Sequence, residues 1–95
     1  MNLLNKKYYK NGNRVFDLKD NVLTYYYKNG QVKATGLYIN DLMEDKWIFY
    51  RESGQLWQVG HFKNNMKHGK WERFDLNNDL EYSEDFIDNK IIKSN

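Results

Sequence analysis

The chain repeats itself with a period of 24 residues, and this self-similarity constrains its fold more than any other feature. A shift by that period places Gly30 on Gly54 and Trp47 on Trp71. It also pairs Gly36 with Gly60, Val32 with Leu56, Tyr38 with Phe62 and Asn40 with Asn64. Such a period is typical of repeat architectures, in which each unit covers its apolar face by stacking on its neighbours. The chain of 95 residues is therefore predicted to form one domain, spanning 1–95, built from stacked units.

The terminal units differ from the central ones. We divide the chain into a shortened unit at 8–25, two full units at 26–49 and 50–73, and a degraded capping unit at 74–95. In the first unit, the motif that starts at Tyr9 recurs at Tyr27, only 18 residues later. In the last unit, Asn78 and Glu84 stand at the two glycine positions. Atypical end units are expected in a stack because they cap it.

The composition favours strands over helices. The chain contains a single Ala, Ala34, and no Pro, while 17% of its residues are aromatic. Ala favours helices and aromatic residues favour strands, so this balance predicts β-structure. No long stretch keeps apolar residues at the helical spacing of i, i+3, i+4 and i+7. We expect strands at 13–18, 22–28, 31–39, 46–51, 55–63, 70–75 and 79–87.

Short polar connections separate these segments. Asn29-Gly30, between two runs of strand-forming residues, is the strongest short hairpin signal and predicts a tight primed turn. The longer polar connections at 40–45 and 64–69 predict wider loops. Because neighbours in sequence then become neighbours in the sheet, the expected fold is an all-β antiparallel meander of stacked β-hairpins. Simple alternation places Trp57 on the face opposite Ala34.

Several function classes lack their signals in this sequence. There is no Cys, so neither a disulfide framework nor a thiolate zinc site is expected. His61 and His68 are too few for a hydrolytic metal site, and the segment 75–79 is interpreted as a polar hairpin turn, not a calcium loop. Neither a nucleophile elbow nor a phosphate-binding loop is present. We therefore expect no enzyme activity, no cofactor and no metal.

Charge and the N-terminal sequence suggest the surroundings of the protein. Residues 1–74 carry 13 Lys and Arg against 7 Asp and Glu, whereas residues 75–95 carry 2 against 6. The net charge of +2 thus hides a basic body and an acidic end. This asymmetry indicates either two solvated surfaces or an acidic end that docks on a basic partner. The first residues contain no apolar leader, which makes the cytoplasm the expected compartment.

The repeat resembles the MORN repeat variant. The first copy reads Tyr26, Gly30, Val32, Gly36, Tyr38, Asn40 and Lys46-Trp47, and the second reads Tyr50, Gly54, Leu56, Gly60, Phe62, Asn64 and Lys70-Trp71. The resemblance implies β-hairpins stacked into a twisted, elongated sheet, and it brings no catalytic residues. It also implies an interaction scaffold. Many bacterial members are described as antitoxin-like, which would make a toxin encoded nearby the partner, and other members are proposed to touch lipid.

These features predict non-catalytic protein binding. Trp57 breaks the repeat, because Lys33 and Glu81 occupy the equivalent positions, so it is the first candidate for a contact residue. Interface hot spots favour Trp, Tyr and Arg. The predicted binding residues are Trp57, Arg51, Arg73, Tyr50 and Phe74. The edges of the sheet also suggest a homodimer.

Two alternatives remain open. Trp47 with Tyr50, and Trp71 with Phe74, suggest aromatic cages for choline, a carbohydrate or a lipid headgroup at a membrane surface. Aromatic residues interleaved with Lys and Arg also suit single-stranded nucleic acid, although the modest positive charge disfavours this interpretation.

Overall fold

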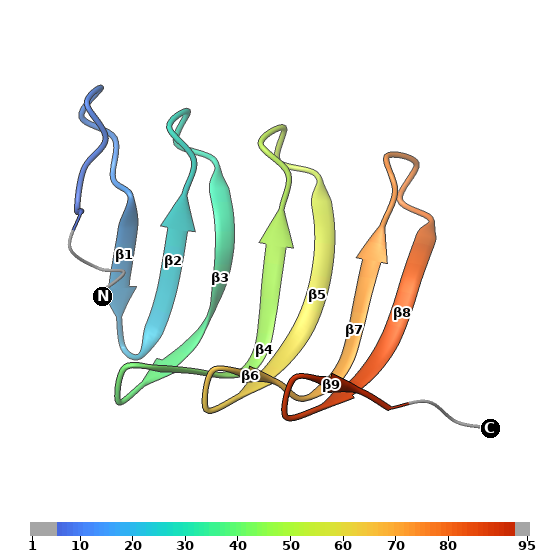
Figure 1. Cartoon of the computed structure of the whole chain (residues 1–95). Coiled ribbons are helices and arrows are strands. Elements are labelled where there is room, and N and C mark those ends of the chain that lie inside the picture. The colour runs from blue at the N-terminus through green and yellow to red at the C-terminus, as the bar shows by residue number, and fades with distance from the viewer. Residues whose placement is uncertain (1–5, 93–95) are drawn as a thin grey trace.

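The computed structural model describes residues 6–92, which form one open antiparallel sheet (Figure 1). The strands are β1 (Phe16–Lys19), β2 (Val22–Tyr26), β3 (Val32–Ile39), β4 (Leu42–Tyr50), β5 (Leu56–Lys63), β6 (Met66–Lys67), β7 (Gly69–Phe74), β8 (Leu80–Ile87) and β9 (Lys90–Ile91). Their order in the sheet is β1-β2-β3-β4-β5-β7-β8-β9, and β6 pairs with β5. The predicted all-β meander of hairpins is therefore confirmed. Within the described residues, no helix is long and apolar enough to cross a membrane.

The connections predicted as wider loops are tight turns, so this prediction was wrong. Asn40 and Asp41 have φ values of 53° and 65°, and Asn64 and Asn65 have 52° and 69°. Two consecutive residues with positive φ define the primed hairpin turn, and Asn and Asp tolerate that conformation because their side chains bond locally. The residues after each turn then continue as strand and not as loop.

The turn predicted as primed at Asn29-Gly30 takes another form. Gly30 has a φ of 89°, whereas Asn29 is not among the residues with positive φ. The Gly30 N–H donates to the Tyr27 carbonyl at 2.9 Å, and the Tyr27 N–H donates to the Gln31 carbonyl at 2.8 Å. This pattern is a three-residue loop with a glycine bulge, which needs only one left-handed residue.

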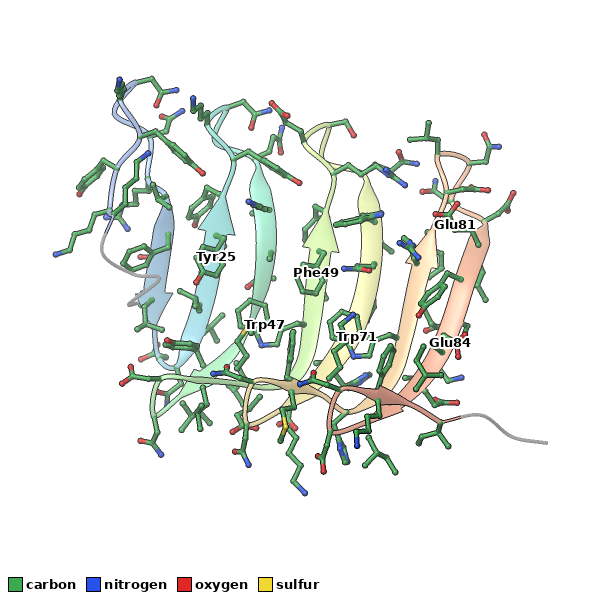
Figure 2. All side chains as sticks on the ribbon, in the orientation of Figure 1. Tyr25, Trp47, Phe49, Trp71, Glu81 and Glu84 are labelled. Carbon is green, nitrogen blue, oxygen red and sulfur yellow. The ribbon has the colours of Figure 1, made fainter. Side chains whose placement is uncertain are left out.

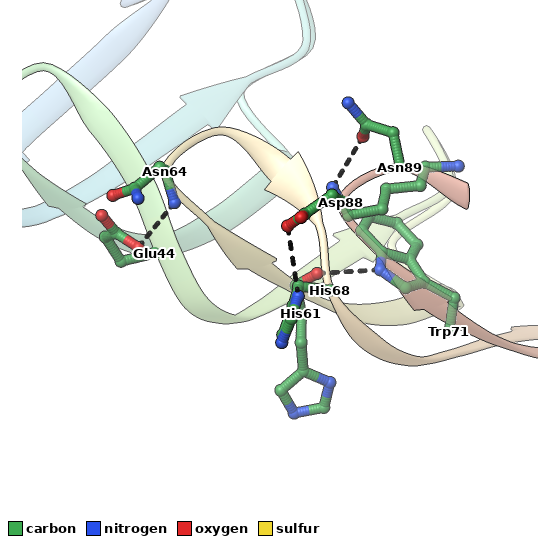
Figure 3. Close-up of polar contacts among 8 residues, drawn as sticks. Glu44, His61, Asn64, His68, Trp71, Asp88 and Asn89 are labelled. Atoms are coloured by element: carbon green, nitrogen blue, oxygen red, sulfur yellow. Dashed lines mark hydrogen bonds and ion pairs between the residues drawn. The ribbon is translucent and has the colours of Figure 1, made fainter. Parts of the chain in front are cut away.

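The two shortest strands, β6 and β9, lie at the lower ends of the long strands (Figure 1). Neighbouring units are joined there by a repeated pair of hydrogen bonds, which we call the clasp. The Met43 N–H donates to Asn65 Oδ1 at 2.6 Å, and the Asn65 N–H returns to the Met43 carbonyl at 3.0 Å. One period later, the Lys67 N–H donates to Asn89 Oδ1 at 2.8 Å (Figure 3), and the Asn89 N–H donates to the Lys67 carbonyl at 2.9 Å. The units are therefore joined by side chains of the turns as well as by the sheet.

Two tryptophans form the centre of the core. Trp47 and Trp71 are 1% and 4% exposed, and each ring packs against a glycine of the preceding strand. A β-carbon on Gly36 would stand 2.4 Å from the Trp47 ring, and one on Gly60 would stand 2.1 Å from the Trp71 ring. The mid-strand glycines thus make room for the indole of the next strand. The other buried core residues are Leu23, Ala34 and Phe86.

The last long strand ends this pattern. Trp71 pairs across the sheet with Glu84, as Trp47 pairs with Gly60. Glu84 therefore occupies the position at which a glycine would receive another indole. The glycine–tryptophan pairs of the sheet are therefore Gly36 with Trp47 and Gly60 with Trp71.

Candidate binding groove

A β-bulge sets the direction of Trp57. Strand β5 pairs with β4 through Gln58 opposite Phe49 and through Leu56 opposite Tyr50, which leaves Trp57 without a partner. A bulge adds one residue to a strand and disturbs the alternation of its side chains. The face assignment from simple alternation was wrong for this reason, because Trp57 lines the same groove as Ala34.

This groove, which we call the aromatic groove, has a volume of about 420 Å³. It lies on the face that carries Tyr25 and Phe49, above the row of Trp47 and Trp71 (Figure 2). Its lining comprises Tyr9, Val15, Tyr25, Tyr26, Tyr27, Lys33, Ala34, Met43, Trp47, Phe49, Tyr50, Trp57 and Phe62. Within residues 6–92, Lys33 is the one charged side chain of this lining, and most of the other residues are aromatic.

The floor and walls of the aromatic groove are held in place. The ring centroids of Trp47 and Phe62 lie 6.0 Å apart, edge to face. The Tyr27 hydroxyl donates to the Tyr50 carbonyl at 2.8 Å. One unit earlier, the Tyr9 hydroxyl donates to the Tyr26 carbonyl at 2.6 Å. Side chains that are fixed in this way lose little entropy when they meet a ligand.

Two tyrosines of the groove, Tyr25 and Tyr27, have raised pKa values. Burial raises the pKa of Tyr25, and the neighbouring Tyr38 adds to the effect. Burial also raises the pKa of Tyr27, with Glu52 acting in the same direction and Arg51 opposing it. These phenols are therefore neutral at physiological pH. The groove offers apolar rings, hydroxyl groups and a single ammonium group.

The five predicted binding residues fall in different places. Trp57 is half-buried in the aromatic groove and Tyr50 also lines it.

Arg51 Nη2 donates to the Phe74 carbonyl at 2.9 Å, which repeats the bond from Tyr27 to Tyr50 one unit later. Arg73 lies 4.6 Å from the Tyr82 ring and 3.6 Å from a Glu81 oxygen. Arg51 and Phe74 are therefore joined to each other, and Arg73 has partners of its own outside the lining.

Sequence reasoning missed part of the groove. Tyr9, Tyr25, Tyr27 and Lys33 line it, but none was among the predicted binding residues. Tyr9 and Tyr27 each begin the turn motif of their unit, and this repeated tyrosine was the available signal. Lys33 occupies the bulge position equivalent to Trp57, so it points into the same groove one unit earlier.

Other candidate sites have structural roles. The Asp75 carboxylate accepts from the Asn77 and Asp79 N–H groups at 2.8 and 3.0 Å, so the segment 75–79 is the predicted hairpin turn.

His61 Nδ1 lies 3.0 Å from the Lys70 carbonyl, and His68 Nδ1 lies 3.7 Å from an Asp88 oxygen (Figure 3). Across residues 6–92, no group of three or more His, Cys, Asp or Glu side chains forms a potential metal site.

Comparison with known families agrees with this architecture. The model of the MORN repeat variant matches residues 19–40 and 46–64, which include Gly36, Gly60, Trp47 and Trp57. MORN repeats are generally non-catalytic modules that bind proteins or membranes. Among curated proteins and among solved structures, none matches the chain.

Proposed function

We propose that this chain is a non-catalytic module that binds a segment of another protein in the aromatic groove. The observation that carries the proposal is that, on the face of the sheet with the aromatic groove, side chains pack on the lower part while the upper part is open. In the lower part, Met43 packs on the core cluster around Trp47, and the Lys67 ammonium lies 4.6 Å from the Trp71 ring. In the upper part, the rings of Tyr25, Phe49 and Trp57 border an open groove.

The charge around the aromatic groove favours an acidic partner. Lys33 lines the groove, and its ammonium lies 5.7 Å from the Tyr27 ring. Residues 6–33, which include β1, β2 and the start of β3 at this end of the sheet, contain seven Lys and Arg and two Asp. A partner segment with apolar side chains and a carboxylate therefore complements the site in both shape and charge.

The resemblance makes a toxin encoded nearby one partner of this kind, with both proteins in the cytoplasm. Pairing of two copies through their sheet edges is a separate proposal, and light scattering tests it directly. Lipid headgroups at a membrane surface are the competing ligand, because Lys6, Lys7 and Arg14 add positive charge near the exposed Tyr8.

A displayed library of random peptides tests the proposal without a known partner. We expect selection on the folded protein to enrich peptides that bind the wild type and lose about 30-fold in affinity on Trp57→Ala. Leu80→Ala is the control, because Leu80 is exposed at the far end of the sheet. Peptides that bind both variants equally would contradict the proposal. Binding to anionic vesicles that Trp57→Ala abolishes, with no peptide enriched, would favour the membrane alternative.

A further inference from the structure

We infer that the aromatic groove accepts an acidic, proline-rich segment in the polyproline II conformation, lying across the strands. This inference rests on the proposed function and specifies its partner. It follows from the spacing of the groove residues, from their chemistry and from the position of Lys33.

The spacing comes from the bulges. Lys33 and Trp57 are the bulge residues of β3 and β5, Val15 holds the equivalent position of the first unit by the sequence repeat, and all three line the groove. Lys33 in β3 and Trp57 in β5 are separated by β4, which places them two strands apart. Two strand spacings amount to about 9.6 Å. A polyproline II helix rises about 9.3 Å per turn of three residues, so every third residue of such a segment meets an equivalent position.

Other backbone conformations fit this spacing less well. An extended strand repeats one face about every 6.7 Å, which is out of step with the units. Seven residues of an α-helix rise about 10.5 Å, so its contacts drift away from the groove residues within two units. The groove also lies on the face of the sheet and not along an edge, so a strand bound there could not add to the backbone ladder.

The lining has the chemistry that polyproline II segments need. Proline-rich ligands dock in grooves of aromatic side chains, where flat rings pack against pyrrolidine rings. Their carbonyl groups have no internal partners and require donors. Trp47 and Trp71 donate their indole N–H groups to the Leu37 and His61 carbonyls, whereas the Trp57 indole makes no hydrogen bond within residues 6–92. Trp57 can therefore donate to a ligand carbonyl.

Lys33 adds a charge requirement to this groove. It stands one unit from Trp57 and is the charged residue of the described lining. A carboxylate on the ligand, one turn away from the residue that packs on Trp57, would meet the Lys33 ammonium. The preferred segment is therefore proline-rich with an acidic side chain, and a basic side chain at the same place would be repelled.

Synthetic peptides test this inference by calorimetry, with the indole N–H signal of Trp57 followed by NMR. The first peptide has a glutamate between two blocks of prolines, the second replaces the prolines by alanine and serine, and the third replaces the glutamate by lysine. We expect the first peptide to bind about tenfold more tightly than either of the others, because it is preorganised and oppositely charged. Trp57→Ala should weaken its binding by about 30-fold.

A charge exchange keeps the test independent of folding defects. Lys33→Glu should prefer the lysine peptide to the glutamate peptide, whereas Lys90→Glu, on the distant strand β9, should keep the wild-type order. Equal affinity for the proline and alanine–serine peptides would overturn the polyproline II assignment. If library peptides without proline bind the groove while the proline peptide does not, the proposed function stands and this inference fails. If no peptide of any kind responds to Trp57→Ala, both fail.

Discussion

The Trp47 indole packs so closely on Gly36 that a β-carbon on this glycine would stand 2.4 Å from three of the ring atoms. Trp71 and Gly60 repeat the relationship one unit later, with a shortest distance of 2.1 Å. Real β-carbons do not approach other atoms so closely, and the neighbour here is a rigid, buried ring. The stack therefore depends on a pair of residue types in adjacent strands and not on tryptophan alone.

We expect Gly36→Ala and Gly60→Ala each to lower the free energy of unfolding by about 3 kcal/mol, because the methyl group overpacks the core. Urea denaturation measures this change. Glu84→Ala is the matched control at the equivalent position of β8, where no indole has to be accommodated, and it should change stability by less than about 1 kcal/mol. A loss at Glu84 as large as that at Gly36 would contradict the packing argument.

The tryptophans should divide into two classes. Trp47→Ala and Trp71→Ala remove rings that are 1% and 4% exposed, so each should cost about 3–5 kcal/mol of stability. Trp57 is half-buried in an open groove, and Trp57→Ala should cost less than about 2 kcal/mol. Thermal melts of the three variants distinguish the classes. Unfolding by Trp57→Ala with an intact Trp47→Ala variant would reverse the assignment.

Gly30 and Gly54 should be sensitive for a different reason. Their φ values are 89° and 95°, a region that β-branched residues avoid, so Gly30→Val and Gly54→Val should each cost about 1–3 kcal/mol. Gly30→Asn provides the comparison, because Asn78 holds the equivalent position in the last unit with a φ of 65°. The Asn variant should retain most of the stability in denaturant titrations. Equal losses for Asn and Val would point to a lost contact and not to backbone strain.

The repeat in the sequence predicted the hairpin stack and the equivalence of Trp47 and Trp71, because a fixed period reports directly on equivalent positions. It did not predict the face of Trp57. One extra residue in β5 shifts the side-chain alternation, and a bulge leaves no signal in an apolar pattern. Strand β6 was missed because Asn64-Asn65 resembles a loop until both residues adopt positive φ. The aromatic groove depends on the bulges that turn Lys33 and Trp57 into it, so its lining could be predicted only in part.

The partly buried phenol of Tyr25 should make the fold sensitive to alkali. The pKa of Tyr25 is raised from 10.0 by burial, so the unfolded chain releases this proton at a lower pH than the folded chain does. The stability that the neutral Tyr25 phenol contributes is therefore complete below about pH 10, and it is lost as the pH rises through the pKa of Tyr25 in the folded state. Melting temperatures should fall above pH 10, and the fall should be smaller for Tyr25→Phe. Parallel curves for the wild type and Tyr25→Phe would show that this phenol does not contribute.

The clasp between Asn65 and Met43 allows backbone conformation and side-chain bonding to be separated. Asn65 has a φ of 69°, and its side-chain oxygen accepts the Met43 N–H at 2.6 Å. Asn65→Gly keeps the left-handed backbone and loses only the side-chain bond, so it should cost about 1 kcal/mol. Asn65→Ala loses the bond and also strains the turn, so it should cost about 1 kcal/mol more. Urea titrations of both variants measure the difference, and hydrogen exchange at the Met43 N–H should be faster in each. If exchange at Met43 is unchanged in Asn65→Gly, the clasp does not join the units in solution.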